Sequence, residues 1–110
     1  MHTQPQPEIP AVTPLEAVDM IAEGAMLIDV REQDEWDTER IPGAVFRPMS
    51  QINAWYQDLP RDRPVIVQCR TGNRSGSVVH ALMSQAGFDN VFNLSGGIVG
   101  WKFQNQAVDR

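Results

Sequence analysis

The residues best suited to chemistry form one short segment, Cys69 to Gly76, with the sequence CRTGNRSG. It follows the apolar run Val65 to Val67 and precedes a stretch with the apolar spacing of a helix. Such a strand–loop–helix unit aims backbone N–H groups and a helix N-terminus at the loop, and Arg70 and Arg74 add positive charge. These surroundings lower the pKa of a cysteine and favour the thiolate, which is the reactive form.

Cys69 is the only cysteine of the 110 residues, so neither an intramolecular disulfide nor a zinc site with several thiolates can form. A lone cysteine at the end of a strand is often an inert core residue, and arginine and glycine are common in such loops. The conjunction of strand, cysteine, two arginines, glycine and helix favours a reactive Cys69. We expect no metal and no cofactor.

Alternating strands and helices must position this loop. The sequence predicts strands over residues 26–30, 45–46, 65–67 and 91–94. Helices are predicted from Thr13 to Gly24, over 33–38, after the loop as far as Gly87, and around Trp101. This order predicts an α/β fold with a parallel sheet and helices on both faces. Residues 1–11 are predicted to be a flexible tail, and 12–110 a single domain.

The overall charge excludes several partners. The net charge of −5 repels phosphate backbones, so we expect no nucleic-acid partner. The sequence has no signal-peptide pattern and no apolar run of bilayer-spanning length, so we expect no membrane partner. These features predict a soluble, cytoplasmic protein, and a monomer is the default expectation.

Four segments, in order, resemble the rhodanese family: LIDVRE, RIPGAV, the loop CRTGNRS and NLSGGIVGW. The resemblance covers about residues 12 to 103. It implies a sheet of about five parallel strands and a Cys69 that accepts sulfane sulfur as a persulfide. It also implies a cradle for that sulfur made by Arg70, Thr71, Gly72, Asn73 and Arg74. Arg40 stands where many members have histidine, which affects the local packing and charge but not the sulfur chemistry.

Several roles follow from this resemblance or from local pattern. Arg70, which we expect to be the more exposed of the two, and Arg74 are candidates to hold the anionic group of a donor, although Arg74 can equally brace the loop. Ser75 fits an N-cap of the following helix. The pair Asp29 and Arg31 is interpreted as a structural ion pair beneath the loop. The acidic run from residue 32 to 39 is interpreted as a solvated face.

The resemblance implies a thiosulfate sulfurtransferase that passes sulfur from Cys69 to a thiophilic acceptor, which is cyanide in the test tube. A phosphatase or arsenate reductase is a second possibility. Their loops, however, have one more residue between cysteine and arginine than the four found here. A non-catalytic binding module is a third, but such family members typically lack the cysteine. A sulfur relay to a partner protein stays open.

Overall fold

Five parallel strands form the central sheet of the computed structural model, which describes residues 8–110. The strands lie in the order β1-β5-β4-β2-β3. Their bounds are β1 Ala11–Val12, β2 Met26–Asp29, β3 Val45–Phe46, β4 Val65–Gln68 and β5 Val91–Leu94. Every neighbouring pair is parallel. The predicted parallel α/β sheet of about five strands is therefore confirmed.

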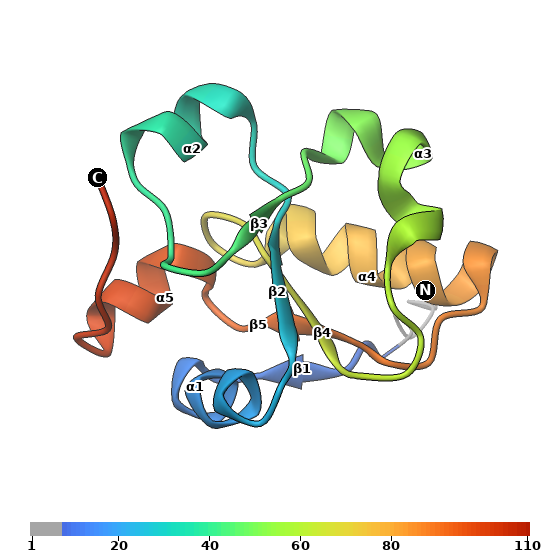
Figure 1. Cartoon of the computed structure of the whole chain (residues 1–110), viewed down its shortest axis with the longest axis horizontal. Helices are drawn as coiled ribbons and strands as arrows, with labels where there is room; N and C mark the ends of the chain where they lie inside the picture. The colour runs from blue at the N-terminus through green and yellow to red at the C-terminus, as the bar shows by residue number, and fades with distance from the viewer. Residues whose placement is uncertain (1–7) are drawn as a thin grey trace, which may run out of the picture.

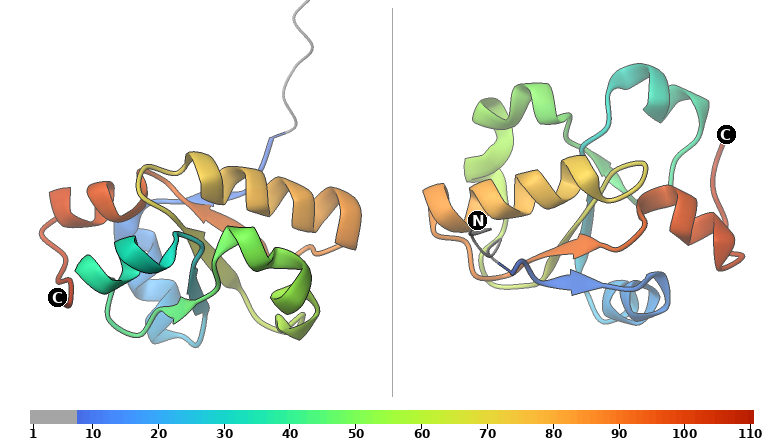
Figure 2. Two further views of the ribbon diagram at one scale, coloured as in Figure 1. Left: turned by 90° about the horizontal axis from the view of Figure 1, so that it is seen from above. Right: turned by 180° about the vertical axis from the view of Figure 1, so that it is seen from behind.

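Helices cover both faces of this sheet, as predicted. They are α1 Pro14–Ala22, α2 Gln33–Thr38, α3 Ile52–Trp55, α4 Asn73–Ala86 and α5 Gly97–Phe103, with short 3₁₀ turns on either side of α3. In Figure 1, α1 and α5 lie to the lower left of the strands, and α3 and α4 lie to the upper right. Figure 2 shows α4 running along one face of the sheet, with the loop that precedes it close to α5.

The alternation of side chains along each strand explains why the strands read as continuous apolar runs. Ile28, Val65 and Val67 pack with the residues of α3 and α4. Their sequence neighbours Leu27 and Ile66 belong to a second cluster with the residues of α1 and α5. Because both faces are covered, both sets of side chains must be apolar, and polar alternation is absent from these strands.

Helix α1 begins where its sequence predicts, directly after Thr13. Thr13 and Glu16 form the reciprocal capping box, and Pro14 is the first helical residue. Leu15 is 54 % exposed, whereas Pro14 and Ala17 are buried. The turn after the helix contains Gly24 with φ +110°, a conformation that favours glycine.

Strand β1 spans the boundary between the predicted tail, residues 1–11, and the predicted domain, residues 12–110. Ala11 already belongs to β1 and pairs with Asn93. The carbonyl group of Pro10 accepts a 2.8 Å hydrogen bond from the backbone N–H of Asn93. Residues 1–7 of the predicted tail lie outside the described residues. No helix within residues 8–110 has both the length and the apolarity needed to cross a membrane.

Candidate active site

Cys69 lies at the carboxyl end of the central strand β4, where parallel α/β sheets bind ligands. The loop occupies the few residues between the end of β4 at Gln68 and the start of α4 at Asn73. Gly72 makes the turn with φ +104° and is the N-cap of α4. In Figure 1 this loop lies between α2 and α5. The loop and the first turn of α4 therefore surround the sulfur atom.

The sulfur of Cys69 accepts two hydrogen bonds from this surrounding structure. The backbone N–H of Gly72 donates at 3.1 Å, and the hydroxyl of Ser75, which shares its one proton between the sulfur and Asn93, lies within donating distance at 3.2 Å. Burial raises the pKa of the thiol, since Cys69 is only 1 % exposed. The hydrogen bonds from the Ser75 side chain and from the backbone at Ser75, Gly72 and Thr71 outweigh burial and lower the pKa from the ordinary 9.0. The site therefore favours a thiolate at Cys69.

Helix α5 supports the loop from behind by binding its carbonyl groups. The backbone N–H of Ile98 donates to the carbonyl oxygen of Cys69 at 2.9 Å, and that of Val99 donates to Arg70 at 3.1 Å. A Cβ atom at Gly97 would overlap both of these carbonyl groups. The close approach therefore requires glycine at this position. With the carbonyl groups held by α5, the amides of the loop are free to face the sulfur.

The side chain of Asn93, on the neighbouring strand β5, joins the loop to the first turn of α4. Its amide nitrogen donates to the carbonyl oxygen of Gly72 at 3.1 Å, and its amide oxygen accepts from the Ser75 hydroxyl at 2.6 Å. Asn93 was not among the site residues predicted from the sequence. The available signal was a polar residue within an otherwise apolar strand, Val91–Leu94.

The prediction that Ser75 caps α4 was wrong. The helix begins at Asn73 with Gly72 as N-cap, so Ser75 lies inside the first turn. There it is fully buried, and its hydroxyl is directed at the sulfur of Cys69 and at Asn93. Glycine in the left-handed conformation starts the helix earlier than a serine cap would, and this shift turns the serine hydroxyl inward.

Arg74 braces the loop against α2. Its guanidinium group makes two hydrogen bonds, at 2.7 and 2.8 Å, to the two carboxylate oxygens of Glu35. This pairing lowers the pKa of Glu35 to about 2 and raises the pKa of Arg74. Of the two roles left open for Arg74, the structure therefore shows the brace. The acidic run 32–39 is also more than a solvated face, because Glu39 pairs with Lys102 of α5.

The predicted ion pair between Asp29 and Arg31 is confirmed. The two groups are 0 and 3 % exposed, and their closest nitrogen–oxygen distance is 2.8 Å. Arg31 also donates to the backbone carbonyl oxygen of Glu39 at 2.7 Å, so it ties β2 to the end of α2. Both of its roles are structural.

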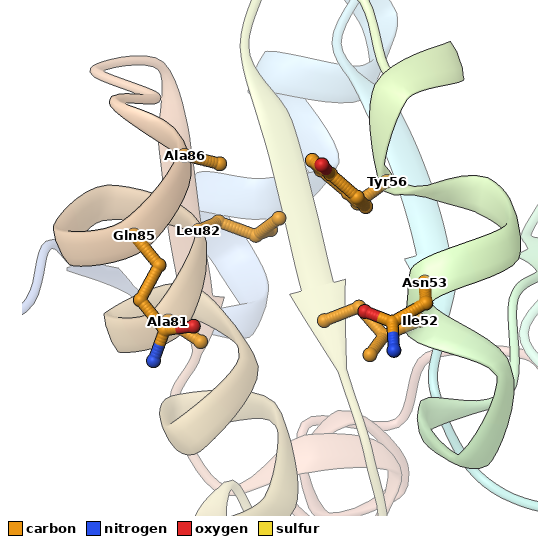
Figure 3. Close-up of a pocket in the computed structure, with 7 residues that line it drawn as sticks. All are labelled: Ile52, Asn53, Tyr56, Ala81, Leu82, Gln85 and Ala86. Carbon is orange, nitrogen blue, oxygen red and sulfur yellow. The ribbon is translucent and has the colours of Figure 1, made fainter.

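The remaining loop residues face solvent. Arg70, Thr71 and Asn73 are exposed, and Arg70 has no ion-pair partner within the described part of the chain. Arg70 lies at the edge of a cleft between α2 and α5. A separate groove between α3 and α4 contains no residue of the loop (Figure 3); it is lined by Ile52, Asn53, Tyr56, Ala81, Leu82, Gln85 and Ala86. The cleft between α2 and α5 reaches the loop at Arg70, and two further clefts contain Thr71 or Gly72 and Asn73.

Known proteins share this sequence and this architecture. Residues 13–104 match the family described as "Rhodanese-like domain". The structure is similar to a rhodanese-related protein from Thermoplasma volcanium, with a TM-score of 0.81, 28 % identity, and coverage of 91 % of this chain and 97 % of that one. The chain belongs to the family of rhodanese-like domain proteins, and the resemblance seen in the sequence is confirmed.

Curated relatives differ in how much of their length this chain covers. A probable adenylyltransferase/sulfurtransferase MoeZ from Mycobacterium tuberculosis is 41 % identical over 86 % of this chain, but the match spans only 25 % of that protein. Thiosulfate sulfurtransferase GlpE from Actinobacillus succinogenes is 40 % identical, with 83 % of this chain and 82 % of the relative covered. A sulfurtransferase from Allochromatium vinosum is 39 % identical, with 72 % of this chain and 73 % of the relative covered.

Proposed function

We propose that this protein is a sulfurtransferase in which Cys69 carries the transferred sulfur as a persulfide. The observation that carries the proposal is the buried Cys69 sulfur, which accepts hydrogen bonds from the Gly72 amide and the Ser75 hydroxyl. Groups that stabilise a thiolate activate the nucleophile, and they also stabilise the same sulfur as a leaving group in the return step. Relatives of similar length that are named sulfurtransferases support this function.

The reaction divides into two half-reactions. In the first, the Cys69 thiolate attacks the outer sulfur of a donor such as thiosulfate, the sulfur–sulfur bond of the donor breaks, and sulfite leaves with the electron pair. In the second, a thiophilic acceptor attacks the outer sulfur of the persulfide, and Cys69 leaves as the thiolate. Two such half-reactions give ping-pong kinetics.

The proposal also specifies thiosulfate as the sulfur donor. Arg70 is exposed beside Cys69 and unpaired within residues 8–110, so its guanidinium is available to an anionic donor in an otherwise acidic protein. Arg74 is engaged by Glu35 and is left to hold the loop in place. The thiosulfate sulfurtransferase GlpE relatives support the same donor.

Mass spectrometry of the intact protein tests the proposal. Protein treated with thiosulfate and then desalted should carry one added sulfur atom per chain. Cyanide should remove that sulfur as thiocyanate, with a yield near one per Cys69, because the chain has no second cysteine to resolve the persulfide.

Cys69→Ser is the matched control, because a serine hydroxyl fills the same position but cannot form a persulfide. The variant should fold normally, gain no sulfur and have no thiosulfate:cyanide activity. Sulfur transfer by this variant, or an unmodified wild-type protein after treatment with thiosulfate, would contradict the assignment of Cys69.

A further inference from the structure

A cleft beside the loop has the dimensions of a small-molecule site. Its volume is about 310 Å³, within the range of roughly 300–1,000 Å³ that is typical of small ligands. It is lined by one loop residue, one residue that follows β2, and residues of α2 and α5: Arg70, Arg31, Asp34, Glu35, Thr38, Glu39, Ile98, Val99 and Lys102. An inorganic donor such as thiosulfate needs less space than this.

Most charged groups around the cleft are already neutralised by a partner. The ion pairs are Arg31 with Asp29, Glu35 with Arg74, and Glu39 with Lys102. The pair of Glu35 with Arg74 holds α2 against the first turn of α4, and the pair of Glu39 with Lys102 holds the end of α2 against α5. They therefore form the walls of the cleft and contribute little net charge to a ligand.

Two charges are left for a ligand, and they have opposite sign. Arg70 on the loop side and Asp34 on the α2 side have no ion-pair partner within residues 8–110. Both side chains are exposed. Helix α5 contributes the aliphatic side chains of Ile98 and Val99 to the lining of the same cleft. A complementary ligand has one anionic group, one cationic group and a short apolar segment.

We propose that this cleft binds a small zwitterionic thiol of the amino-acid type, which accepts the sulfur from Cys69. The carboxylate of the thiol pairs with Arg70, and its ammonium group pairs with Asp34. The proposal rests on the proposed sulfurtransferase function and adds the chemical class of the acceptor. Arg70 and Asp34 act as specificity-determining residues in the second half-reaction.

The transfer step conserves atoms and electrons. The thiolate of the acceptor attacks the outer sulfur of the protonated persulfide, and a new sulfur–sulfur bond forms. The bond between Cys69 and the outer sulfur breaks, and its electron pair returns to the Cys69 sulfur. The proton stays on the transferred sulfur, so the product is the persulfide of the small thiol. The hydrogen bonds from Gly72 and Ser75 stabilise the departing Cys69 thiolate.

The donor half-reaction should not use both residues. Thiosulfate carries only negative charge, so it can pair with Arg70 but gains nothing from Asp34. The rate at which thiosulfate loads sulfur onto Cys69 should therefore not depend on attraction by the Asp34 carboxylate. Because only the acceptor half-reaction uses Asp34, a change at Asp34 should affect discharge of the persulfide by the thiol and not the loading of Cys69.

Single-turnover discharge of the loaded protein tests the proposal. Protein carrying one sulfur per chain is mixed with cysteine, with cysteamine, which lacks the carboxylate, or with 3-mercaptopropionate, which lacks the ammonium group. Rates are compared at equal thiolate concentration. Cysteine should discharge the protein about fivefold faster than either analogue, which is the size expected for one partly exposed ion pair.

Two variants assign these preferences to residues. Arg70→Gln should remove the advantage of cysteine over cysteamine, and Asp34→Asn should remove its advantage over 3-mercaptopropionate. The matched controls Arg63→Gln and Asp37→Asn make the same charge changes outside the cleft and should keep both preferences. Equal rates for the three thiols with the wild-type protein, or preferences unchanged in Arg70→Gln and Asp34→Asn, overturn the acceptor site.

Cyanide distinguishes this failure from failure of the proposed function. Cyanide has no ammonium or carboxylate group and should discharge the loaded protein whatever the acceptor preference. If sulfur loads and cyanide removes it but the three thiols react alike, only the acceptor site is wrong. If no sulfur loads onto Cys69, the sulfurtransferase function itself fails.

Discussion

Removing the Ser75 hydroxyl should make Cys69 a weaker acid and a less reactive nucleophile. Burial raises the pKa of the Cys69 thiol, and the Ser75 side chain makes the largest opposing contribution. Its oxygen lies 3.2 Å from the sulfur and 2.6 Å from the amide oxygen of Asn93. A hydroxyl has one proton, so it donates to the thiolate only at the expense of its bond to Asn93.

The sharing of the Ser75 proton between Cys69 and Asn93 determines how far Ser75→Ala should raise the pKa of Cys69. A hydrogen bond to a charged group contributes about 1.5–3 kcal/mol. One pKa unit corresponds to about 1.36 kcal/mol. Because the proton is shared with Asn93, the lower end applies, and the pKa of Cys69 should rise by about one unit. At a pH below both values, the thiolate fraction falls about tenfold.

The rate of alkylation of Cys69 by iodoacetamide as a function of pH measures this pKa. Cys69 is the only cysteine, so the reaction reports a single site. The wild-type midpoint should lie below 9.0, and that of Ser75→Ala about one unit higher. Ser77→Ala is the control, since its hydroxyl faces solvent and donates to the carbonyl oxygen of Asn73. An unchanged midpoint in Ser75→Ala would refute the proposed role of the hydroxyl.

Further predictions concern the supports of the loop. Glu35→Gln should lower stability at neutral pH by about 1 kcal/mol in urea unfolding, since the pair with Arg74 is partly exposed. Because folding lowers the pKa of Glu35, this difference should persist above about pH 4.3 and close as the pH falls towards about 2. Gly97→Ala should cost more than about 2 kcal/mol through its clash with loop carbonyl groups. Gly43→Ala, with positive φ but no nearby atoms, should cost only about 1 kcal/mol. Equal costs for both glycine variants would contradict the close approach of α5.

Local pattern in the sequence determined the elements and the position of the nucleophile. The apolar runs of β2 and β4 predicted a sheet covered on both faces, because buried parallel strands have no solvent side. The helix start predicted at Thr13 coincides with the capping box that begins α1. Cys69 and its loop were predictable for the same reason: the whole loop is contiguous in the chain, so its chemistry can be recognised without knowledge of distant contacts.

Only the tertiary structure decided which distant groups meet this loop. Glu35, Asn93 and Gly97 lie more than twenty residues from Cys69, and they reach the loop because the sheet order places β5 next to β4 and brings α2 and α5 to the same edge. Ser75 shows the same limit at short range. Serine is a common N-cap residue, but the left-handed Gly72 begins the helix earlier and turns the Ser75 hydroxyl towards the sulfur. Residue spacing reports periodicity along one segment, whereas these contacts depend on how separate segments pack against one another.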